Sequence, residues 1–212
     1  MTRKHLSNLH VSLLAYWACL GGALYLFAEL AGEVSEHEGF FFDAPILSWF
    51  AAHQTFKLVS TAQALSLLFA PVMLALVSAG IAIALGKKHL RDSLFLALSL
   101  GGATLLNVFF KLFFERLRPS VAERLTPAPG FLFPSGHAMA SAAFSLGLYL
   151  LIRRLYPRYQ WGIAFVGVLL TFLVGLSRLD LQVHYPSDVL AGWALAVAWV
   201  LGVNLWYART NC

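Results

Sequence analysis

The chain of 212 residues is 59% hydrophobic and 12% charged, and its mean hydropathy is +0.73. Soluble domains carry charge on about a quarter of their residues, and disordered chains are less apolar still, so both classes are excluded in favour of an integral membrane protein. The net charge of +5 does not indicate nucleic-acid binding, because the basic residues are scattered between long apolar runs and form no continuous face.

Six apolar runs approach the roughly 20 residues that a helix needs to cross a membrane. They cover residues 9–30, 58–85, 93–114, 138–152, 161–176 and 189–208. None shows the period-two alternation of a barrel strand, and a backbone in lipid must satisfy its hydrogen bonds within a helix or a closed barrel. The sequence therefore predicts one domain, 1–212, that is an all-α integral membrane protein with a six-transmembrane-helix bundle.

The first run follows the basic residues Arg3 and Lys4, as the apolar part of a signal peptide would. It continues to residue 30 without a clear cleavage pattern, so we expect an uncleaved helix. Cys19 lies inside this run and Cys212 is the last residue. A disulfide between them is not expected, because the distance between two bridged Cα atoms is short.

Positive charge predicts the orientation, because short cytoplasmic loops are enriched in Lys and Arg. The first connection carries five carboxylates against Lys57, whereas the two ends and the second and fourth connections are basic. These basic residues are Arg3, Lys4, Lys87, Lys88, Arg91, Arg153, Arg154, Arg158 and Arg209. We therefore expect both termini in the cytoplasm, and the first, third and fifth connections on the periplasmic or extracellular side of a cytoplasmic membrane.

The first outer connection contains an aromatic segment, residues 40–50. Asp43 is placed to cap a short helix, with Ile46, Leu47 and Phe50 on one side of it. Such a helix would lie on the membrane surface. Its aromatic side chains then serve either as interfacial anchors or in the access of a substrate.

The third connection opens with a cluster at 111–119, in which Lys111 precedes Arg118 and Pro119. If the preceding helix continues, Lys111 and Arg118 share one face and Pro119 ends the helix. The two cations would then point together. The alternative is that Lys111 pairs with Glu115 and Arg118 binds a lipid phosphate.

The same connection ends in a second cluster, 134–137, which leads into the fourth apolar run. Ser135 and Gly136 stand where a helix begins, and His137 follows them. The free N–H groups and positive dipole at a helix N-terminus bind anions, so a histidine there is placed to donate a proton to a bound phosphate. The alternative is a helix cap beside an interfacial histidine.

The fifth connection holds the third cluster, 177–188. Ser187 is an expected N-cap of the last helix, which places Asp188 in its first turn, within reach of His184. An Asp that accepts from one ring nitrogen leaves the other unprotonated and nucleophilic. Asp188 could instead serve only the helix dipole. Arg178 follows a short apolar run at membrane depth, where an ionisable group is costly and usually functional.

Together the clusters place cations, two histidines, an Asp and a helix N-terminus on one side of the membrane, as a phosphate site with a nucleophile and an acid requires. No carboxylate cluster or His-x-x-x-His pair indicates a metal. In order and spacing the three clusters resemble the signature of the type 2 phosphatidic acid phosphatases, a family of integral-membrane lipid phosphatases. The matching residues are Lys111, Arg118, Pro119, Pro134, Ser135, Gly136, His137, Ser177, Arg178, His184 and Asp188.

The resemblance implies a role for each matching residue. His184 would be the nucleophile that forms a phosphohistidine, Asp188 would orient it, and His137 would protonate the leaving oxygen and then activate water. The phosphate oxygens would be held by Lys111, Arg118, Arg178, Ser135 and the backbone of Gly136. Ser177 would be structural. The family needs no metal, and we expect no cofactor.

The substrate that the resemblance implies is a phosphorylated membrane lipid: undecaprenyl diphosphate, phosphatidylglycerophosphate or phosphatidic acid. Asp180 and Gln182 stand where relatives often have an aromatic residue and a glycine, and Asp180 would either pair with Arg178, repel a second phosphate or point to water. The alternatives to hydrolysis are phosphoryl transfer from a lipid diphosphate to another lipid and a non-catalytic phospholipid carrier. No feature indicates a nucleic-acid partner or an obligate protein partner.

Overall fold

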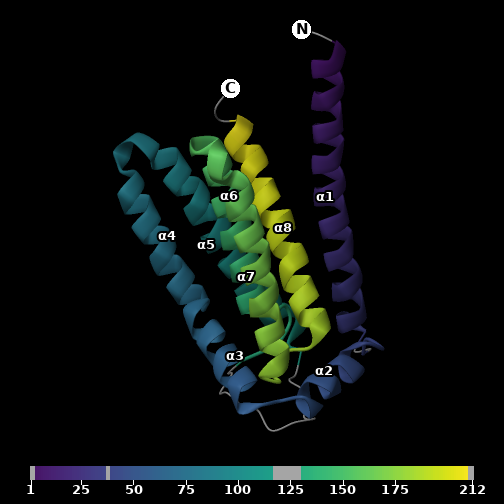
Figure 1. Cartoon of the computed structure of the whole chain (residues 1–212). Helices are drawn as coiled ribbons and strands as arrows, with labels where there is room; N and C mark the ends of the chain where they lie inside the picture. The colour runs from purple at the N-terminus through teal and green to yellow at the C-terminus, as the bar shows by residue number, and fades with distance from the viewer. Residues whose placement is uncertain (1–2, 37–38, 117–129, 210–212) are drawn as a thin grey trace.

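The computed structural model describes residues 3–36, 39–116 and 130–209, which form helices and, within those ranges, no β-strand. The expected all-α class is confirmed (Figure 1). The α-helices are α1 (Arg3–Ser35), α2 (Asp43–Ala52), α3 (Phe56–Leu68), α4 (Pro71–Leu85), α5 (Leu90–Phe114), α6 (Gly136–Leu155), α7 (Gln160–Asp180) and α8 (Pro186–Arg209). Two short 3-10 helices, η1 (Lys87–His89) and η2 (Pro157–Tyr159), precede α5 and α7.

Helix α6 is central to the bundle and packs against α5, α7 and α8, while α1 packs along α8 (Figure 1). Its inward face is built from small or fully buried side chains, such as Met139 and Ala143, and they meet Phe95 of α5 and Val200 of α8 in one apolar core. Burial of these side chains holds the helices together at van der Waals distance, as association within lipid requires.

Five helices in the described part of the chain are long and apolar enough to cross a membrane, and the number is six if α3 and α4 together form one broken span. The sequence predicted an unbroken helix over 58–85, and this is wrong: α3 and α4 are bent by 47° at Phe69 and Ala70. Pro71 explains the break, because it has no N–H to continue α3 and its fixed φ suits the first position of α4.

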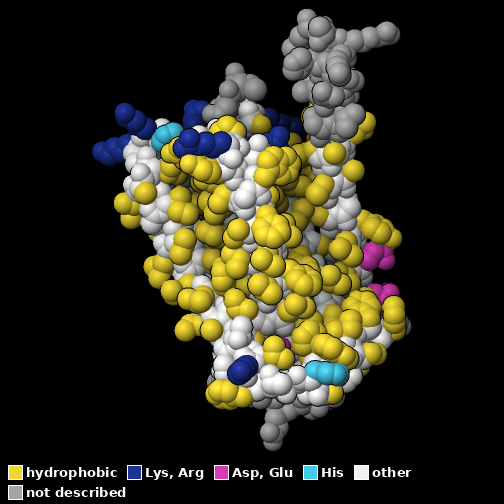
Figure 2. All heavy atoms as spheres, viewed as in Figure 1, with side chains coloured by type: hydrophobic (Ala, Val, Ile, Leu, Met, Phe, Trp, Pro, Cys, Tyr) yellow, Lys and Arg dark blue, Asp and Glu magenta, His cyan; other side chains and the backbone are white. Residues whose placement is uncertain are grey.

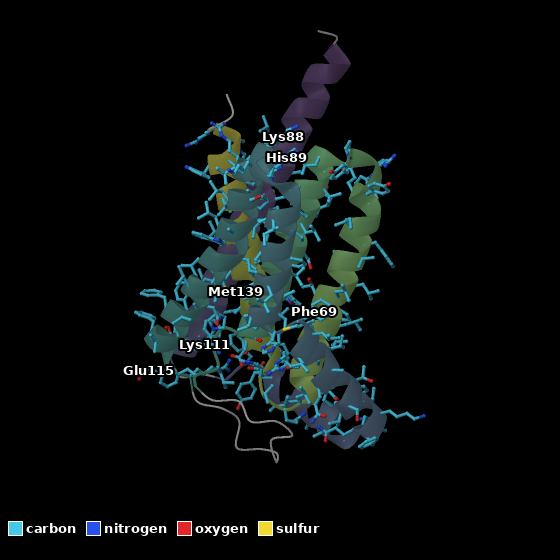
Figure 3. All side chains as sticks on the ribbon, turned by 90° about the vertical axis from the view of Figure 1, so that its left-hand side faces the viewer. Phe69, Lys88, His89, Lys111, Glu115 and Met139 are labelled. Carbon is cyan, nitrogen blue, oxygen red and sulfur yellow. The ribbon has the colours of Figure 1, made fainter. Side chains whose placement is uncertain are left out.

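Charge separates the two ends of the bundle. Hydrophobic side chains cover the middle of the face seen in Figure 2, and Lys and Arg side chains gather at the end where α1 begins and α8 ends. Figure 3 places Lys88 and His89 at that end, and Lys111 and Glu115 towards the other. The predicted clusters therefore lie at the end opposite to the basic loops.

Helix α2 crosses the end of the bundle that carries the clusters, and it contacts α7 and α8. Two amides tie it to the end of α7: Gln182 Nε2 donates to the carbonyl of Leu47 at 3.1 Å, and Gln54 Nε2 donates to that of Asp180 at 2.7 Å. Leu47 is buried, whereas Trp49 is 56% exposed. The expected short helix is thus present, but Asp43 lies in its first turn and does not cap it.

A glycine allows α8 to cross the start of α6 closely. A Cβ added to Gly192 would lie 2.8 Å from the carbonyl oxygen of Ser135 and 3.2 Å from the backbone N of Met139. Both are backbone atoms, which cannot rotate away as a side chain does. Because position 192 carries no side chain, α8 packs directly against the loop that carries Ser135.

We expect Gly192→Ala to lower the stability of the folded protein by about 1–3 kcal/mol, the usual cost of overpacking a core. The change is measured as a lower Tm of purified protein in detergent. Gly202→Ala is the matched control on the same helix, because no atom lies within 4 Å of its added Cβ, and its Tm should equal or exceed that of wild type. Equal values for the two variants would contradict the role given to Gly192.

Candidate active site

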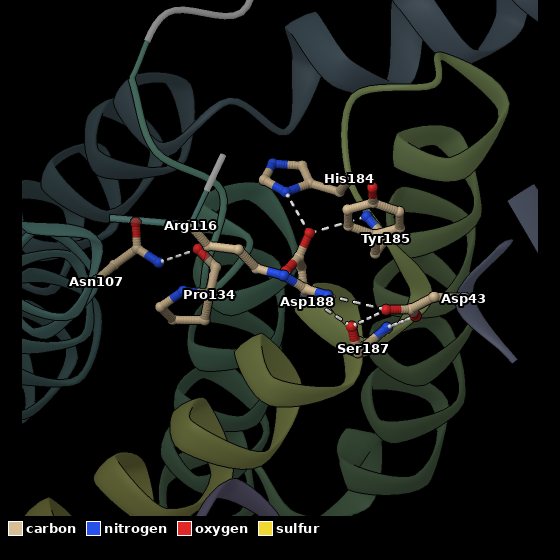
Figure 4. A network of polar contacts seen from close by, with 8 residues as sticks. All are labelled: Asp43, Asn107, Arg116, Pro134, His184, Tyr185, Ser187 and Asp188. Carbon is tan, nitrogen blue, oxygen red and sulfur yellow. Dashed lines mark hydrogen bonds and ion pairs between the residues drawn. The ribbon is translucent and has the colours of Figure 1, made fainter. Parts of the chain in front are cut away.

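His184 and Asp188 form a buried pair at the junction of α7 and α8 (Figure 4). His184 lies in the turn before α8 and Asp188 in its first turn; the distance from Nδ1 to Oδ2 is 3.5 Å. Exposure is 3% for His184 and 0% for Asp188. Asp188 Oδ2 also accepts a hydrogen bond from the backbone N of Tyr185 at 2.8 Å. With Nδ1 facing the carboxylate, Nε2 is the ring nitrogen left for a substrate.

The pKa of His184 is lowered from its ordinary 6.5 to about 4, chiefly because burial disfavours the charged imidazolium. The carboxylate of Asp188 opposes this shift, and the positive charges of Arg178 and Lys111 reinforce it. The imidazole is therefore neutral at neutral pH, with a lone pair available. Two of the predicted phosphate-binding cations thus act electrostatically on the predicted nucleophile.

Ser66 of α3 links two predicted site residues. Arg178, which is 5% exposed in the last turn of α7, donates from Nη1 to Ser66 Oγ at 2.5 Å. His137 Nε2 lies 3.1 Å from the carbonyl oxygen of Ser66 and 3.4 Å from its Oγ. Ser66 was not predicted from the sequence, because a single serine in an apolar run carries no signal of its own.

The start of α6 is shaped as an anion site. Ser135 is the N-cap residue; it is fully buried, and its Oγ has no hydrogen-bond partner among the described residues. The first N–H groups of a helix also lack partners within it, and the helix dipole favours negative charge there. Gly136 makes room for this close approach, since an added Cβ would lie 3.0 Å from Asn107 Oδ1. These groups suit a phosphate.

Helices α5 and α8 hold this turn from two sides. Asn107 Nδ2 donates to the carbonyl of Pro134 at 2.9 Å, and the backbone N of Ser135 donates to that of Asp188 at 3.0 Å. Asn107 was not predicted as a site residue, although a polar side chain inside the apolar run 93–114 was a usable signal. The predicted anion site and the predicted nucleophile are therefore joined directly through Asp188.

The first cluster differs from its prediction. Lys111 lies in the last turn of α5, but the helix ends at Phe114, because Glu115 adopts a left-handed conformation with φ of 45°. The continuation of this helix, on which the predicted pairing of Lys111 with Arg118 depends, is therefore not found. Arg118 and Pro119 lie outside the described residues.

Arg116 connects Asp188 to α2, a link that the sequence analysis missed (Figure 4). Its Nη1 lies 2.6 Å from Asp188 Oδ1 and 2.8 Å from Ser187 Oγ, and its Nη2 lies 3.1 Å from Asp43 Oδ2. Ser187 donates to Asp43 from its backbone N at 2.9 Å and from Oγ at 2.6 Å. The expected N-cap role of Ser187 is wrong, because α8 already begins at Pro186.

Burial raises the pKa of the Asp43 carboxyl, whereas the hydrogen bonds from Ser187 and the charge of Arg116 act to lower it.

Asp180 is also buried, and its Oδ2 has no hydrogen-bond partner within the described ranges. Ser177 Oγ donates to the carbonyl of Val174 within α7 at 2.7 Å. In the described part of the chain, no group of three or more His, Cys, Asp or Glu side chains is arranged to hold a metal ion.

The model of the PAP2 superfamily matches residues 92–212, which is more than half of the chain. The chain belongs to the PAP2 superfamily. This confirms the family resemblance of the three clusters, all of which lie inside the matched range. Asp43 and Ser66 lie outside it, so α2 and α3 add contacts to the PAP2 site from a part of the chain that the family model does not reach.

Two relatives of known name match the chain in part. It is 35% identical over 109 residues to phosphatidylglycerophosphatase B of Bacillus subtilis, covering 50% of this chain and 53% of the relative. It is 30% identical over 119 residues to undecaprenyl-diphosphatase of Sulfolobus acidocaldarius, covering 54% of each. The chain thus spans about half the length of these relatives.

The PAP2 fold extends over nearly the whole chain. A crystal structure of a transmembrane PAP2-type phosphatidylglycerolphosphate phosphatase from Bacillus subtilis superposes with a TM-score of 0.77. The match covers 91% of this chain and 97% of that one, at 24% sequence identity. The fold, with α1 to α4 included, is therefore that of a transmembrane PAP2 protein.

Proposed function

We propose that this PAP2 protein is a metal-independent membrane lipid phosphatase that hydrolyses a phosphate monoester or diphosphate lipid through a phosphohistidine at His184. The observation that carries the proposal is the buried, neutral His184, held by Asp188 and facing the charges of Arg178 and Lys111. A neutral imidazole is nucleophilic, and fixed cations stabilise the charge of a transferring phosphoryl group.

The reaction proceeds in two steps. In the first, His184 Nε2 attacks phosphorus, an N–P bond forms, and the P–O bond to the lipid breaks as His137 gives its proton to the leaving oxygen. In the second, His137 takes a proton from water, whose oxygen bonds to phosphorus as the N–P bond breaks and inorganic phosphate leaves. Asp188 stabilises the positive charge on His184 between the steps. The roles are those of general acid and base catalysis.

The transferring group is held by the positive side chains and the start of α6. Lys111, Arg178 and the predicted Arg118 neutralise the phosphate oxygens, and the buried Ser135 Oγ and the first N–H groups of α6 donate to them. The lipid tail stays in the bilayer. The names of the two relatives make phosphatidylglycerophosphate and undecaprenyl diphosphate the first substrates to compare, with phosphatidic acid as a third.

We also propose six membrane crossings in the cytoplasmic membrane, with α3 and α4 as one broken span, both termini in the cytoplasm, and the site at the periplasmic or extracellular face. The supporting observation is that Lys87, Lys88, Arg153 and Arg158 lie in the connections at the end of the bundle opposite to the clusters. Basic loops stay in the cytoplasm.

This orientation predicts which positions an impermeant maleimide reaches on intact cells. In a background with Cys19 and Cys212 replaced by serine, Phe41→Cys should be labelled directly, since Phe41 is 91% exposed. Lys88→Cys should be labelled only after the membrane is permeabilised. Labelling of Lys88→Cys but not Phe41→Cys on intact cells would reverse the proposed topology.

The function is tested by phosphate release from purified protein in detergent, with chelator present, across the three lipids above. We expect release from at least one lipid, and a fall of at least about 1,000-fold in His184→Ala, because the covalent route is lost. Millimolar vanadate should inhibit, since it occupies a phosphate site.

His53→Ala is the matched control, because His53 is an exposed histidine at the same end of the bundle. It should retain wild-type activity. Strong residual release from folded His184→Ala would refute the nucleophile. A phosphorylated lipid product in place of free phosphate would identify a transferase, and no turnover with folding intact would favour a carrier.

A further inference from the structure

We propose that Arg116 and Asp43 are positioning residues that orient Asp188 toward His184, which makes the outer helix α2 a working part of the active site. This inference rests on the function proposed above. It assigns a role to two charged residues outside the three-part signature, the partly buried Arg116 and the buried Asp43. Asp43 comes from a helix that the sequence pattern assigned to the membrane surface.

First, the two carboxylate oxygens of Asp188 have different partners. Oδ2 faces His184 Nδ1 and accepts from the backbone N of Tyr185, whereas Oδ1 is bound by Arg116 at 2.6 Å. A carboxylate held at one oxygen alone rotates about its side-chain bonds. Because Arg116 fixes the second oxygen, Asp188 presents Oδ2 to the imidazole in one orientation.

The second step is the position of Arg116 itself. It leaves the end of α5 just beyond the left-handed Glu115, and its guanidinium lies over the ring of Tyr185 at 4.6 Å from the centroid. The planar fork reaches Asp188 with Nη1 and Asp43 with Nη2. A guanidinium bridges two carboxylates in fixed geometry, which a lysine ammonium does not reproduce. The side chain is 14% exposed, so this ion pair is largely desolvated.

The third step is the anchoring of Asp43. Its carboxylate accepts the backbone N–H and the hydroxyl of Ser187, the residue just before Asp188. Asp43 therefore binds the first turn of α8 and the guanidinium of Arg116 at the same time. Gln182, just after α7, donates to Leu47 of α2, and Gln54, just after α2, donates to Asp180 at the end of α7. The position of Asp43 is therefore supported by the packing of α2 against α7.

This arrangement has an electrostatic consequence for His184. The groups that face the imidazole are Asp188 from α8, Arg178 from α7, Lys111 from α5 and His137 from α6. Arg116 shares its positive charge between Asp188 and Asp43. Removal of Arg116 leaves the negative charge of Asp188 less compensated and raises the pKa of His184. Neutralisation of Asp43 leaves the positive charge of Arg116 less compensated and lowers that pKa.

The experiment compares Asp43→Asn and Arg116→Gln by two readouts: kcat for the best lipid substrate, and the pKa of His184 from NMR of ¹⁵N-histidine-labelled protein in detergent, assigned with His184→Gln. We expect kcat to fall about 10- to 100-fold in both variants, as for the loss of an orienting contact. We expect the pKa of His184 to rise in Arg116→Gln and to fall in Asp43→Asn.

Two further variants separate positioning from a structural role. Glu115→Gln removes a carboxylate next to Arg116 that is exposed, and it should leave kcat and the pKa of His184 unchanged. Arg116→Lys keeps the charge but loses the fork, so the pKa should return close to wild type while kcat stays low. It also provides a folded protein if Arg116→Gln does not fold.

The changes in kcat and in the pKa of His184, taken together, decide the inference. Opposite pKa shifts with lowered kcat support it. A lowered kcat without opposite shifts, or wild-type kcat in Asp43→Asn, overturns it. If the wild-type protein releases phosphate from none of the lipids, the proposed function fails, while the NMR titration still decides whether Arg116 and Asp43 act on His184.

Discussion

The rest of the site depends on the contacts made by the buried carboxylate of Asp188. Its oxygens meet His184, Arg116 and the backbone of Tyr185, and its own carbonyl accepts from Ser135 at the start of α6. One residue in the first turn of α8 thereby joins the three clusters and α2. A buried charge is tolerated only with such partners, so the same contacts that satisfy Asp188 also fix its geometry relative to His184.

The apolar bundle supplies the rigidity that this polar centre needs. Gly192 lets α8 approach the turn at Ser135, and Asn107 holds that turn from α5. Small residues allow close helix approach in lipid, where no hydrophobic effect drives helices together and van der Waals packing must do so. The site therefore lies on helix ends whose positions are set by packing deeper in the membrane.

Local contacts could be predicted from the sequence, and distant ones could not. His184 and Asp188 are four residues apart at the start of the last helix, so their pairing was predicted from local spacing, and the start of α6 was evident from Ser135 and Gly136. Asp43 and Ser187 are 144 residues apart, and no local pattern links them. The break at Pro71 had a signal that the long apolar run obscured, whereas the left-handed Glu115 that ends α5 had none. The roles of the site residues remain predictions.

The central claim is that His184 carries the phosphoryl group, and rapid-quench labelling tests it most directly. Wild-type protein mixed briefly with a lipid radiolabelled in its phosphate should yield a phosphoenzyme that is stable in alkali and labile in acid, as phosphohistidine is. Peptide mapping should place the label on His184, and His184→Gln should carry none. Turnover with no phosphoenzyme, or a label on another residue, would contradict the account.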